Sequence, residues 1–126
     1  MPSPNSSIAP DKRPLDLTVI VPAYNEEAAL DASVRELVAE VGDCGLETEI
    51  VVVNDGSEDR TGEIADRLSA AFPNVRAVHH AVNQGWGEAV RTGIANAKKE
   101  LLVLSPVDSP IRRQELLRFV DRKSVV

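Results

Sequence analysis

The chain has 126 residues, of which 43% are hydrophobic and 27% are charged, and its formal net charge is −6. This length suits one domain with a modest core, and the composition is that of a soluble globular protein. The negative charge argues against a nucleic-acid partner, which normally requires a basic face. It does not argue against a nucleotide, which a few local donors can hold. The single cysteine, Cys44, excludes an internal disulfide framework and favours a reducing compartment.

The first 14 residues contain four prolines and three serines and no apolar core. They are predicted to form a disordered tail, not a signal peptide, and residues 15–126 are predicted to form one domain. The apolar runs are too short to cross a bilayer. A cytoplasmic location is therefore expected, and peripheral attachment to the inner face of a membrane stays open.

Runs of apolar, β-branched residues predict four strands, and a helical pattern follows each of them. The predicted strands are residues 15–21, 49–53, 75–79 and 101–104. The predicted helices are a segment from Leu30 to Val41 that stops at Gly42, and residues 61–72, 87–98 and 113–121. In the third of these helices, Val90, Ile94 and Ala97 are expected to face the core.

This alternation predicts an α/β fold with an open, doubly wound, mostly parallel sheet, helices on both faces and right-handed crossovers. Ligands of such sheets bind outside the carboxyl ends of the strands. The segments that follow the four predicted strands are therefore the candidate site: residues 22–27, 54–57, 80–87 and 105–110.

The first two segments carry groups that suit a nucleotide. Tyr24 offers a ring that can lie against a base, and Glu26 adds a carboxylate beside it. Asp55 could accept the N–H of a base, and the glycine after it permits an unusual backbone. Each segment has a local alternative that leads when it is taken singly: Asn25 caps the first helix, with Glu26 and its neighbour favouring the helix dipole, and residues 54–57 cap the second helix.

The third segment holds Gly85-Trp86-Gly87 in front of a helix. It matches a dinucleotide fingerprint poorly, because Val90 stands at the third glycine position and the motif follows the third strand. The glycines still permit close backbone approach to a ligand, and Arg91 could reach a diphosphate. Trp86 either stacks on a ligand or covers the sheet edge. His79 and His80 are expected to be strand and edge residues, since no cysteine or third histidine lies at metal-binding spacing.

Together, residues 19–27, 51–61 and 83–94 resemble the three signatures of the family 2 glycosyltransferases. The likeness is strongest to the polyprenyl-phosphate type typified by dolichol-phosphate mannose synthase, and it extends from Leu17 to about Val120. It implies a GT-A fold that binds a UDP- or GDP-linked sugar and transfers the sugar, with inversion, to a polyprenyl phosphate or another glycan acceptor. The residues that it implies for the nucleotide-sugar site are Pro22, Ala23, Tyr24, Glu26, Asp55, Gly56, Ser57, Asn83, Gly85, Arg91 and Asp108.

The resemblance also implies a metal site after the fourth strand, where the family places Asp-x-Asp. Mg²⁺ or Mn²⁺ is held there by carboxylates and phosphate oxygens, and it offsets the charge that builds on the leaving diphosphate. Here the triplet is Pro106-Val107-Asp108, and Pro110 stands at the position of the usual glutamine. Asp108 is the remaining candidate metal ligand of a weakened site, unless it only caps the loop. No catalytic residue is assigned.

Two hypotheses follow from these motifs. The first is the donor-binding domain of an inverting glycosyltransferase, with the acceptor half expected to be absent because the sequence stops about one helix after the fourth junction. The second is a non-catalytic nucleotide-binding or interaction module that kept the fold and lost the metal site, since function resides in sites and not in folds.

Overall fold

The computed structural model describes residues 16–42 and 44–118, and it contains the predicted parallel α/β fold. The predicted tail of residues 1–14 and the end of the last predicted helix lie outside the described residues. The strands are β1 (Asp16–Ala23), β2 (Glu47–Asn54), β3 (Val75–His79) and β4 (Leu101–Leu104). The helices are α2 (Leu30–Gly42), α3 (Thr61–Ala71) and α4 (Trp86–Asn96), and residues 113–118 are also helical.

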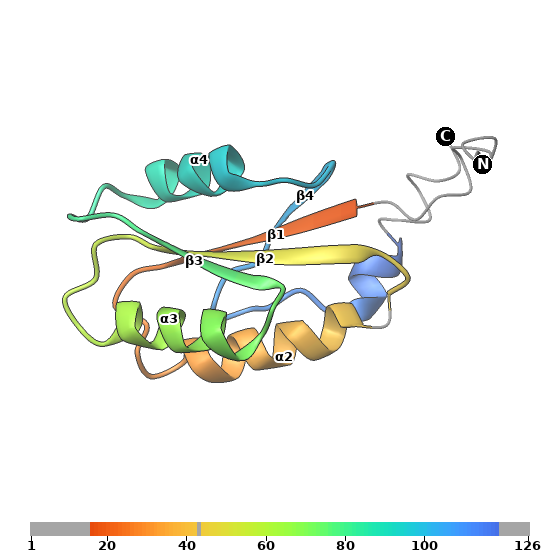
Figure 1. The fold of residues 1–126 in the computed structure, drawn as a ribbon, viewed down its shortest axis with the longest axis horizontal. Coiled ribbons are helices and arrows are strands. Elements are labelled where there is room, and N and C mark those ends of the chain that lie inside the picture. Colours follow the sequence, from red (N-terminus) through yellow and green to blue (C-terminus); the bar gives the residue numbers. More distant parts are fainter. Residues whose placement is uncertain (1–15, 43, 119–126) are drawn as a thin grey trace.

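The four strands are parallel and lie in the order β3-β2-β1-β4. Helices α2 and α3 cover one face of the sheet, and α4 covers the other (Figure 1). The chain therefore moves outward from β1 through β2 to β3, and then crosses back over the sheet to β4. The reversal puts a topological switch point between β1 and β4, and open α/β sheets bind ligands in the crevice at such a point.

Both faces of the sheet are buried, which explains why the central strands are apolar at consecutive positions. Successive side chains point to opposite faces, so Val19 and Val21 pack in the larger cluster with α2 and α3, and Ile20 packs in a smaller cluster beneath α4. The same alternation divides β2, where Val51 and Val53 belong to the smaller cluster.

The prediction for the inward face of α4 is wrong in part. Ala89 and Gly93 are the buried residues of this helix, whereas Ile94 is 49% exposed and Val90 is half-buried. A Cβ atom added at Gly93 would collide with the side chain of Ile20. The helix therefore lies against β1 through its smallest residues, and a larger inward-facing side chain would lift it off the sheet.

Backbone hydrogen bonds bring the predicted ligand-binding segments together just past the strand ends. The N–H of Asp55 donates to the carbonyl of Ala23, and the N–H of His80 donates to the carbonyl of Asn54, both at 2.9 Å. The N–H of Ser105 donates to the carbonyl of Ile20 at 2.9 Å. The four junctions are thus held at one edge of the sheet.

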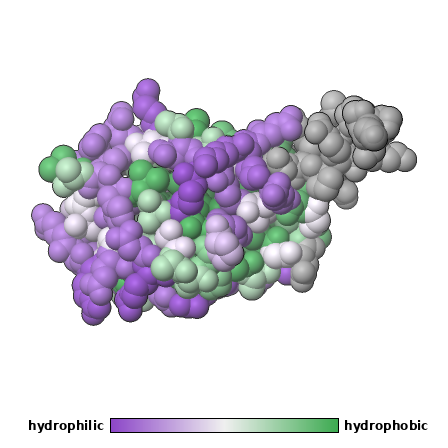
Figure 2. All heavy atoms as spheres, in the orientation of Figure 1, coloured by the Kyte–Doolittle hydropathy of each residue, from purple (hydrophilic) through white to green (hydrophobic). Residues whose placement is uncertain are grey.

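Hydrophilic residues cover most of the face seen in Figure 2, and apolar residues emerge in patches between them. Within residues 16–42 and 44–118, no helix combines the length and the apolar character that crossing a membrane requires.

Candidate functional site

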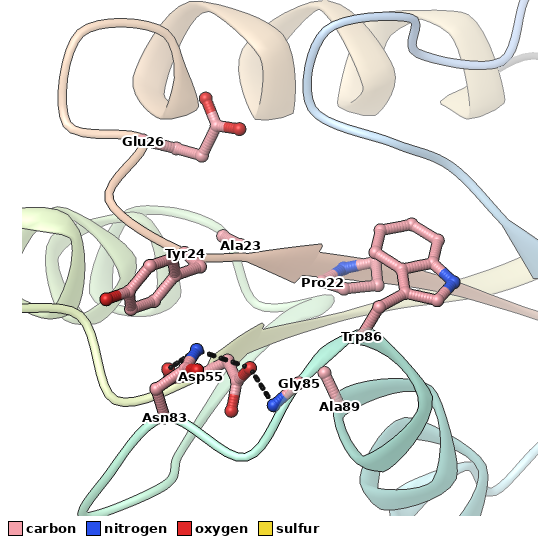
Figure 3. Close-up of a pocket in the computed structure, with 9 residues that line it drawn as sticks. All are labelled: Pro22, Ala23, Tyr24, Glu26, Asp55, Asn83, Gly85, Trp86 and Ala89. Atoms are coloured by element: carbon pink, nitrogen blue, oxygen red, sulfur yellow. Dashed lines mark hydrogen bonds between the residues drawn. The ribbon is translucent and has the colours of Figure 1, made fainter.

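A cavity of about 350 Å³ opens at the carboxyl ends of β1 and β2, beside the first turn of α4 (Figure 3). Seven of the residues expected from sequence line it, together with two residues of α4 that were not in that set. The lining residues are Pro22, Ala23, Tyr24, Glu26, Asp55, Asn83, Gly85, Trp86 and Ala89. Three segments far apart in the chain therefore build one pocket at the predicted edge of the sheet.

Four expected residues are not part of this lining. Gly56 and Ser57 follow Asp55 in the loop between β2 and α3, where they contact neighbouring loops. Arg91 lies on α4 with its side chain 79% exposed and its Nε 3.6 Å from a carboxylate oxygen of Glu88. Asp108 is exposed in the loop after β4.

The loop after β1 is bonded to the loop after β2. Asn25 adopts a left-handed backbone with φ of 53°, its N–H donates to Ser57 Oγ, and its side-chain oxygen accepts the N–H of Glu58, both at 2.9 Å. The N–H of Glu26 donates to Thr61 Oγ1 at 2.7 Å. These bonds hold the Tyr24 and Glu26 side of the pocket in a defined position.

The two helix-capping alternatives are therefore wrong. Helix α2 begins at Leu30, five residues after Asn25, so the Asn25 side chain bonds the neighbouring loop and not the first turn. Helix α3 begins at Thr61, and its N-cap, Arg60, makes no side-chain cap hydrogen bond. Residues 54–57 lie before that cap and organise the loop.

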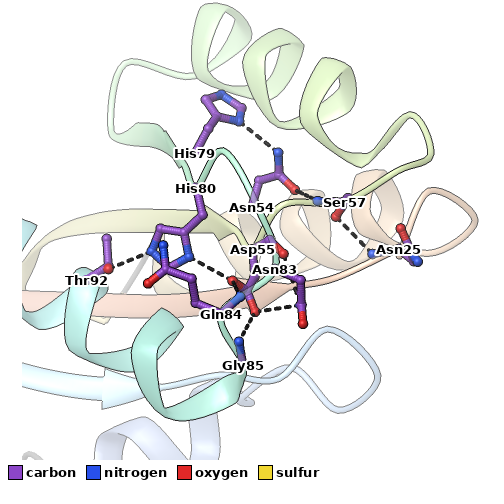
Figure 4. A network of polar contacts seen from close by, with 10 residues as sticks. All are labelled: Asn25, Asn54, Asp55, Ser57, His79, His80, Asn83, Gln84, Gly85 and Thr92. Carbon is purple, nitrogen blue, oxygen red and sulfur yellow. Dashed lines mark hydrogen bonds and ion pairs between the residues drawn. The ribbon is translucent and has the colours of Figure 1, made fainter.

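Asp55 is the most heavily bonded side chain of the pocket (Figures 3 and 4). Its Oδ1 accepts from His80 Nδ1 at 2.7 Å and from the N–H of Gln84 at 2.9 Å. Its Oδ2 accepts from Asn83 Nδ2 and from the N–H of Gly85, both at 2.9 Å. Burial raises the pKa of this carboxyl, but the hydrogen bonds from His80, Gln84 and Gly85 outweigh burial, and the net pKa lies below its usual value.

Two aromatic rings and one available carboxylate face the cavity. Tyr24 and Trp86 lie at opposite ends of the row of lining residues in Figure 3, and they are 43% and 54% exposed. Because Trp86 lines the cavity, it is available to stack on a ligand. Among the described residues, no side chain or backbone group donates a hydrogen bond to the Glu26 carboxylate. The pocket thus offers flat apolar faces and a free acceptor.

The described residues do not form a metal site by themselves. No group of three or more His, Cys, Asp or Glu residues within the described ranges could hold a metal ion. Asp108 is the one carboxylate among residues 105–112, which follow β4. A hard divalent cation takes six or more oxygen ligands, so a bound diphosphate and waters would have to supply the others.

His79 is the last residue of β3, as expected, but the environment of His80 was not anticipated. His80 Nδ1 bonds Asp55, and its Nε2 lies 2.7 Å from Thr92 Oγ1 on α4. The partners are 25 and 12 residues away in the chain. Sequence spacing carries no signal for such a contact, and neither His80 nor Thr92 lines the cavity.

Comparison with known proteins identifies the family. Residues 18–123 match the model of glycosyl transferase family 2. A dolichyl-phosphate beta-glucosyltransferase of Trichomonas vaginalis is 35% identical over 97 residues, which are 73% of this chain and 30% of that protein. An undecaprenyl-phosphate 4-deoxy-4-formamido-L-arabinose transferase of Edwardsiella ictaluri is 32% identical over 107 residues, covering 83% of this chain and 33% of the relative. The chain thus spans about a third of the length of these relatives.

Solved structures of glycosyltransferases share the fold. The mannosyltransferase PcManGT from Pyrobaculum calidifontis, in complex with GDP-Man and Mn²⁺, aligns with a TM-score of 0.75 and 25% identity over 87% of this chain and 32% of that chain. TarS of S. aureus in complex with UDP-GlcNAc aligns with a TM-score of 0.72 and 25% identity over 85% of this chain and 30% of that chain. The match to the family model and the shared GT-A fold lead to one conclusion: this chain belongs to glycosyltransferase family 2.

Proposed function

We propose that the pocket binds a nucleoside-diphosphate sugar, UDP- or GDP-linked, as the donor site of a polyprenyl-phosphate glycosyltransferase. The observation that carries the proposal is the convergence of Tyr24, Glu26, Asp55 and Trp86 on one cavity at the carboxyl ends of the strands. Nucleotides need flat apolar surfaces for the base and polar groups for its edge and for the ribose. The cavity combines both.

Within this proposal, the aromatic rings and Glu26 have separate roles. Tyr24 or Trp86 provides a face for the base, because each ring is about half exposed at the cavity. Glu26 accepts an N–H of the base or a ribose hydroxyl, since its carboxylate has no donor among the described residues. A carboxylate accepts hydrogen bonds but donates none when ionised, so it favours ligands that present N–H or O–H groups.

The proposed acceptor is a polyprenyl phosphate, and the support comes from the relatives, which are dolichyl-phosphate and undecaprenyl-phosphate transferases. A phosphate acceptor is already anionic, so the reaction needs no general base to remove a proton from it. Transfer with inversion at the sugar carbon is part of the same proposal. It can be checked by NMR assignment of the anomeric configuration in the product.

The proposed metal ligand is Asp108, with Mg²⁺ or Mn²⁺ bound only when the donor diphosphate is present. One protein carboxylate is a small donor set, and the substrate must complete the coordination. The Mn²⁺ in the PcManGT complex supports a metal in the related site. The cation would offset charge on the departing diphosphate.

Isothermal titration of the chain with UDP, GDP, UDP-glucose and GDP-mannose, each with and without Mn²⁺, tests the proposal. We expect one nucleotide class to bind, with higher affinity in Mn²⁺, and the Mn²⁺ effect to disappear in Asp108→Asn. Glu100→Gln is the matched control, because Glu100 is an exposed carboxylate just before β4, whereas Asp108 lies beyond its other end. This control should keep the Mn²⁺ effect.

The outcomes separate the two hypotheses. Metal-independent binding that Asp108→Asn leaves unchanged favours a non-catalytic nucleotide-binding module, for which Pro106 in place of the family's first aspartate is the supporting observation. Failure of all four ligands to bind, with and without Mn²⁺, contradicts both the donor site and the binding module.

A further inference from the structure

The carboxylate of Asp55 already has a full set of hydrogen-bond donors. Each of its two oxygens accepts two bonds, and an ionised carboxylate has about four acceptor positions. Three of the donors come from consecutive residues of the segment between β3 and α4, namely Asn83, Gln84 and Gly85. The end of β2 thus holds the segment that leads into α4 (Figure 4).

The fourth donor, His80, is held at both ring nitrogens. Its side chain is 9% exposed and that of Asp55 is 4% exposed, so the contact is shielded from water. Because an ionised carboxylate only accepts, Nδ1 of His80 carries the proton of this bond. In the neutral ring, Nε2 is then an acceptor and receives the hydroxyl proton of Thr92 at 2.7 Å.

This chain of contacts crosses three elements at the pocket edge. Asp55 follows β2, His80 follows β3, and Thr92 lies two turns into α4. If the His80 contact were absent, Oδ1 of Asp55 would keep one donor, and a buried charge with too few donors is costly. The carboxylate would then shift toward water or other donors, and the bonds to Gln84 and Gly85 would shift with it.

We propose that His80 is a positioning residue of the pocket, which fixes Asn83 and Gly85 at the cavity wall through Asp55. Thr92 bonds the far side of the ring, and the acceptor-only carboxylate of Asp55 sets the tautomer. That the pocket binds a nucleotide rests on the proposed function. The positioning of the loop does not depend on the occupant, so it can be measured without ligand.

Four variants test the inference. His80→Leu removes both ring contacts, His80→Asn keeps an N–H donor close to the position of Nδ1, and Thr92→Val removes the hydroxyl at the far side of the ring. His79→Leu is the matched control, because it removes the preceding histidine of the same strand end, which bonds Asn54 and Asp66 and does not line the cavity. The readouts are amide hydrogen exchange at Gln84 and Gly85 without ligand, and the Kd of the UDP or GDP that the wild type binds.

In His80→Leu we expect the amides of Gln84 and Gly85 to exchange faster and the nucleotide to bind about tenfold more weakly, the usual consequence of losing a hydrogen bond to a charged group. His80→Asn should restore most of both properties, and His79→Leu should keep both. Equal exchange and affinity in wild type, His80→Leu and Thr92→Val would overturn the inference. If the wild type binds no nucleotide, the proposed function fails, but the exchange rates still decide the role of His80.

A measurement on the unmodified chain covers the case in which His80→Leu does not fold. Ring ¹⁵N chemical shifts should show His80 protonated at Nδ1 with Nε2 as an acceptor. His80 protonated only at Nε2 would contradict the inference, because Nδ1 could then not donate to Asp55.

Discussion

At the scale of single residues, Gly56 shows why a glycine follows the Asp55 carboxylate. Its φ is +66°, a region that L side chains rarely adopt. A Cβ atom added there would collide with backbone atoms of Val82 and Asn83. The motif predicted that Gly56 belongs to the nucleotide site. In the structure, Gly56 lets the loop after β2 approach the loop after β3, and it supports the pocket in this way. A direct contact of Gly56 with the ligand stays a prediction.

Gly56→Ala is expected to lower the free energy of unfolding by about 2 kcal/mol or more, since it combines a left-handed alanine with a backbone collision. Gly45→Ala is the control, because Gly45 has φ of +81° but nothing within 4 Å of an added Cβ. Gly45→Ala should lower the free energy of unfolding by about 1 kcal/mol, which is the cost of the left-handed backbone without a collision. Urea unfolding followed by circular dichroism measures both values, and equal losses would contradict the proposed loop contact.

At the scale of elements, α4 is positioned by small residues. Ala89 and Gly93 lie four residues apart, so they share one face of the helix. That face lies on Ile20 of β1 and places the first turn of α4, with Trp86, at the mouth of the cavity. The close packing of α4 therefore sets the position of one wall of the pocket.

Gly93→Ala should destabilise the chain by roughly 1–3 kcal/mol, the usual cost of overpacking, although alanine is the better helix former. Gly87→Ala in the same helix has nothing within 4 Å of the added Cβ, so it should be neutral or stabilising by up to about 1 kcal/mol. Thermal unfolding of the two variants provides the comparison. A stabilised Gly93→Ala would show that α4 does not need close contact with Ile20.

At the scale of the whole molecule, two buried carboxylates join elements at opposite edges of the sheet. Asp55 does so at the carboxyl ends of the strands, as described above. Glu49 does so near the amino ends, where it accepts Thr18 Oγ1 and the N–H of Lys98, both at 2.6 Å, and Arg76 Nη2 at 3.2 Å. Burial raises the pKa of Glu49, but these donors outweigh it and hold the pKa below its ordinary value.

The lowered pKa values predict that acid destabilises the chain. The ordinary values are 4.5 for Glu49 and 3.8 for Asp55, and both folded-state values lie lower. The stabilisation by the ionised forms is therefore complete above pH 4.5 and is lost as the pH falls through 3.8 toward the folded-state values. Urea unfolding at pH 7, 5, 4 and 3 measures the free energy of unfolding. The contribution of Glu49 and Asp55 to it should be constant between pH 7 and 5 and should decrease at lower pH.

Glu49→Gln assigns part of this pH dependence. It should lower stability at pH 7 by about 1–3 kcal/mol, because charged hydrogen bonds become neutral ones, and it should reduce the decrease below pH 4.5. Glu47→Gln is the control, since that side chain is 73% exposed. An unchanged acid profile in Glu49→Gln would mean that other groups cause the loss of stability.

The sequence alone determined the elements, because hydrophobic periodicity is a local property. The predicted strands of residues 75–79 and 101–104 have the bounds of β3 and β4. Strand β1 runs two residues further than expected, through Pro22 to Ala23. Pro22 is accommodated because the backbone N–H and C=O groups of the even-numbered residues of β1 point toward β4, and the pairing with β4 ends at Ile20. The missing N–H of the proline therefore costs no hydrogen bond of the sheet.

The sequence also determined the family and most of the cavity lining, because both follow from motifs at the ends of strands and parallel strands bring those ends to one edge. The tertiary structure alone decided which face of α4 is buried, and that His80 and Thr92 support Asp55. These features depend on contacts between residues 12 to 73 positions apart, such as His80 with Thr92 and Ile20 with Gly93. No local pattern encodes such contacts, since they exist only once the crossovers have stacked α4 on the sheet.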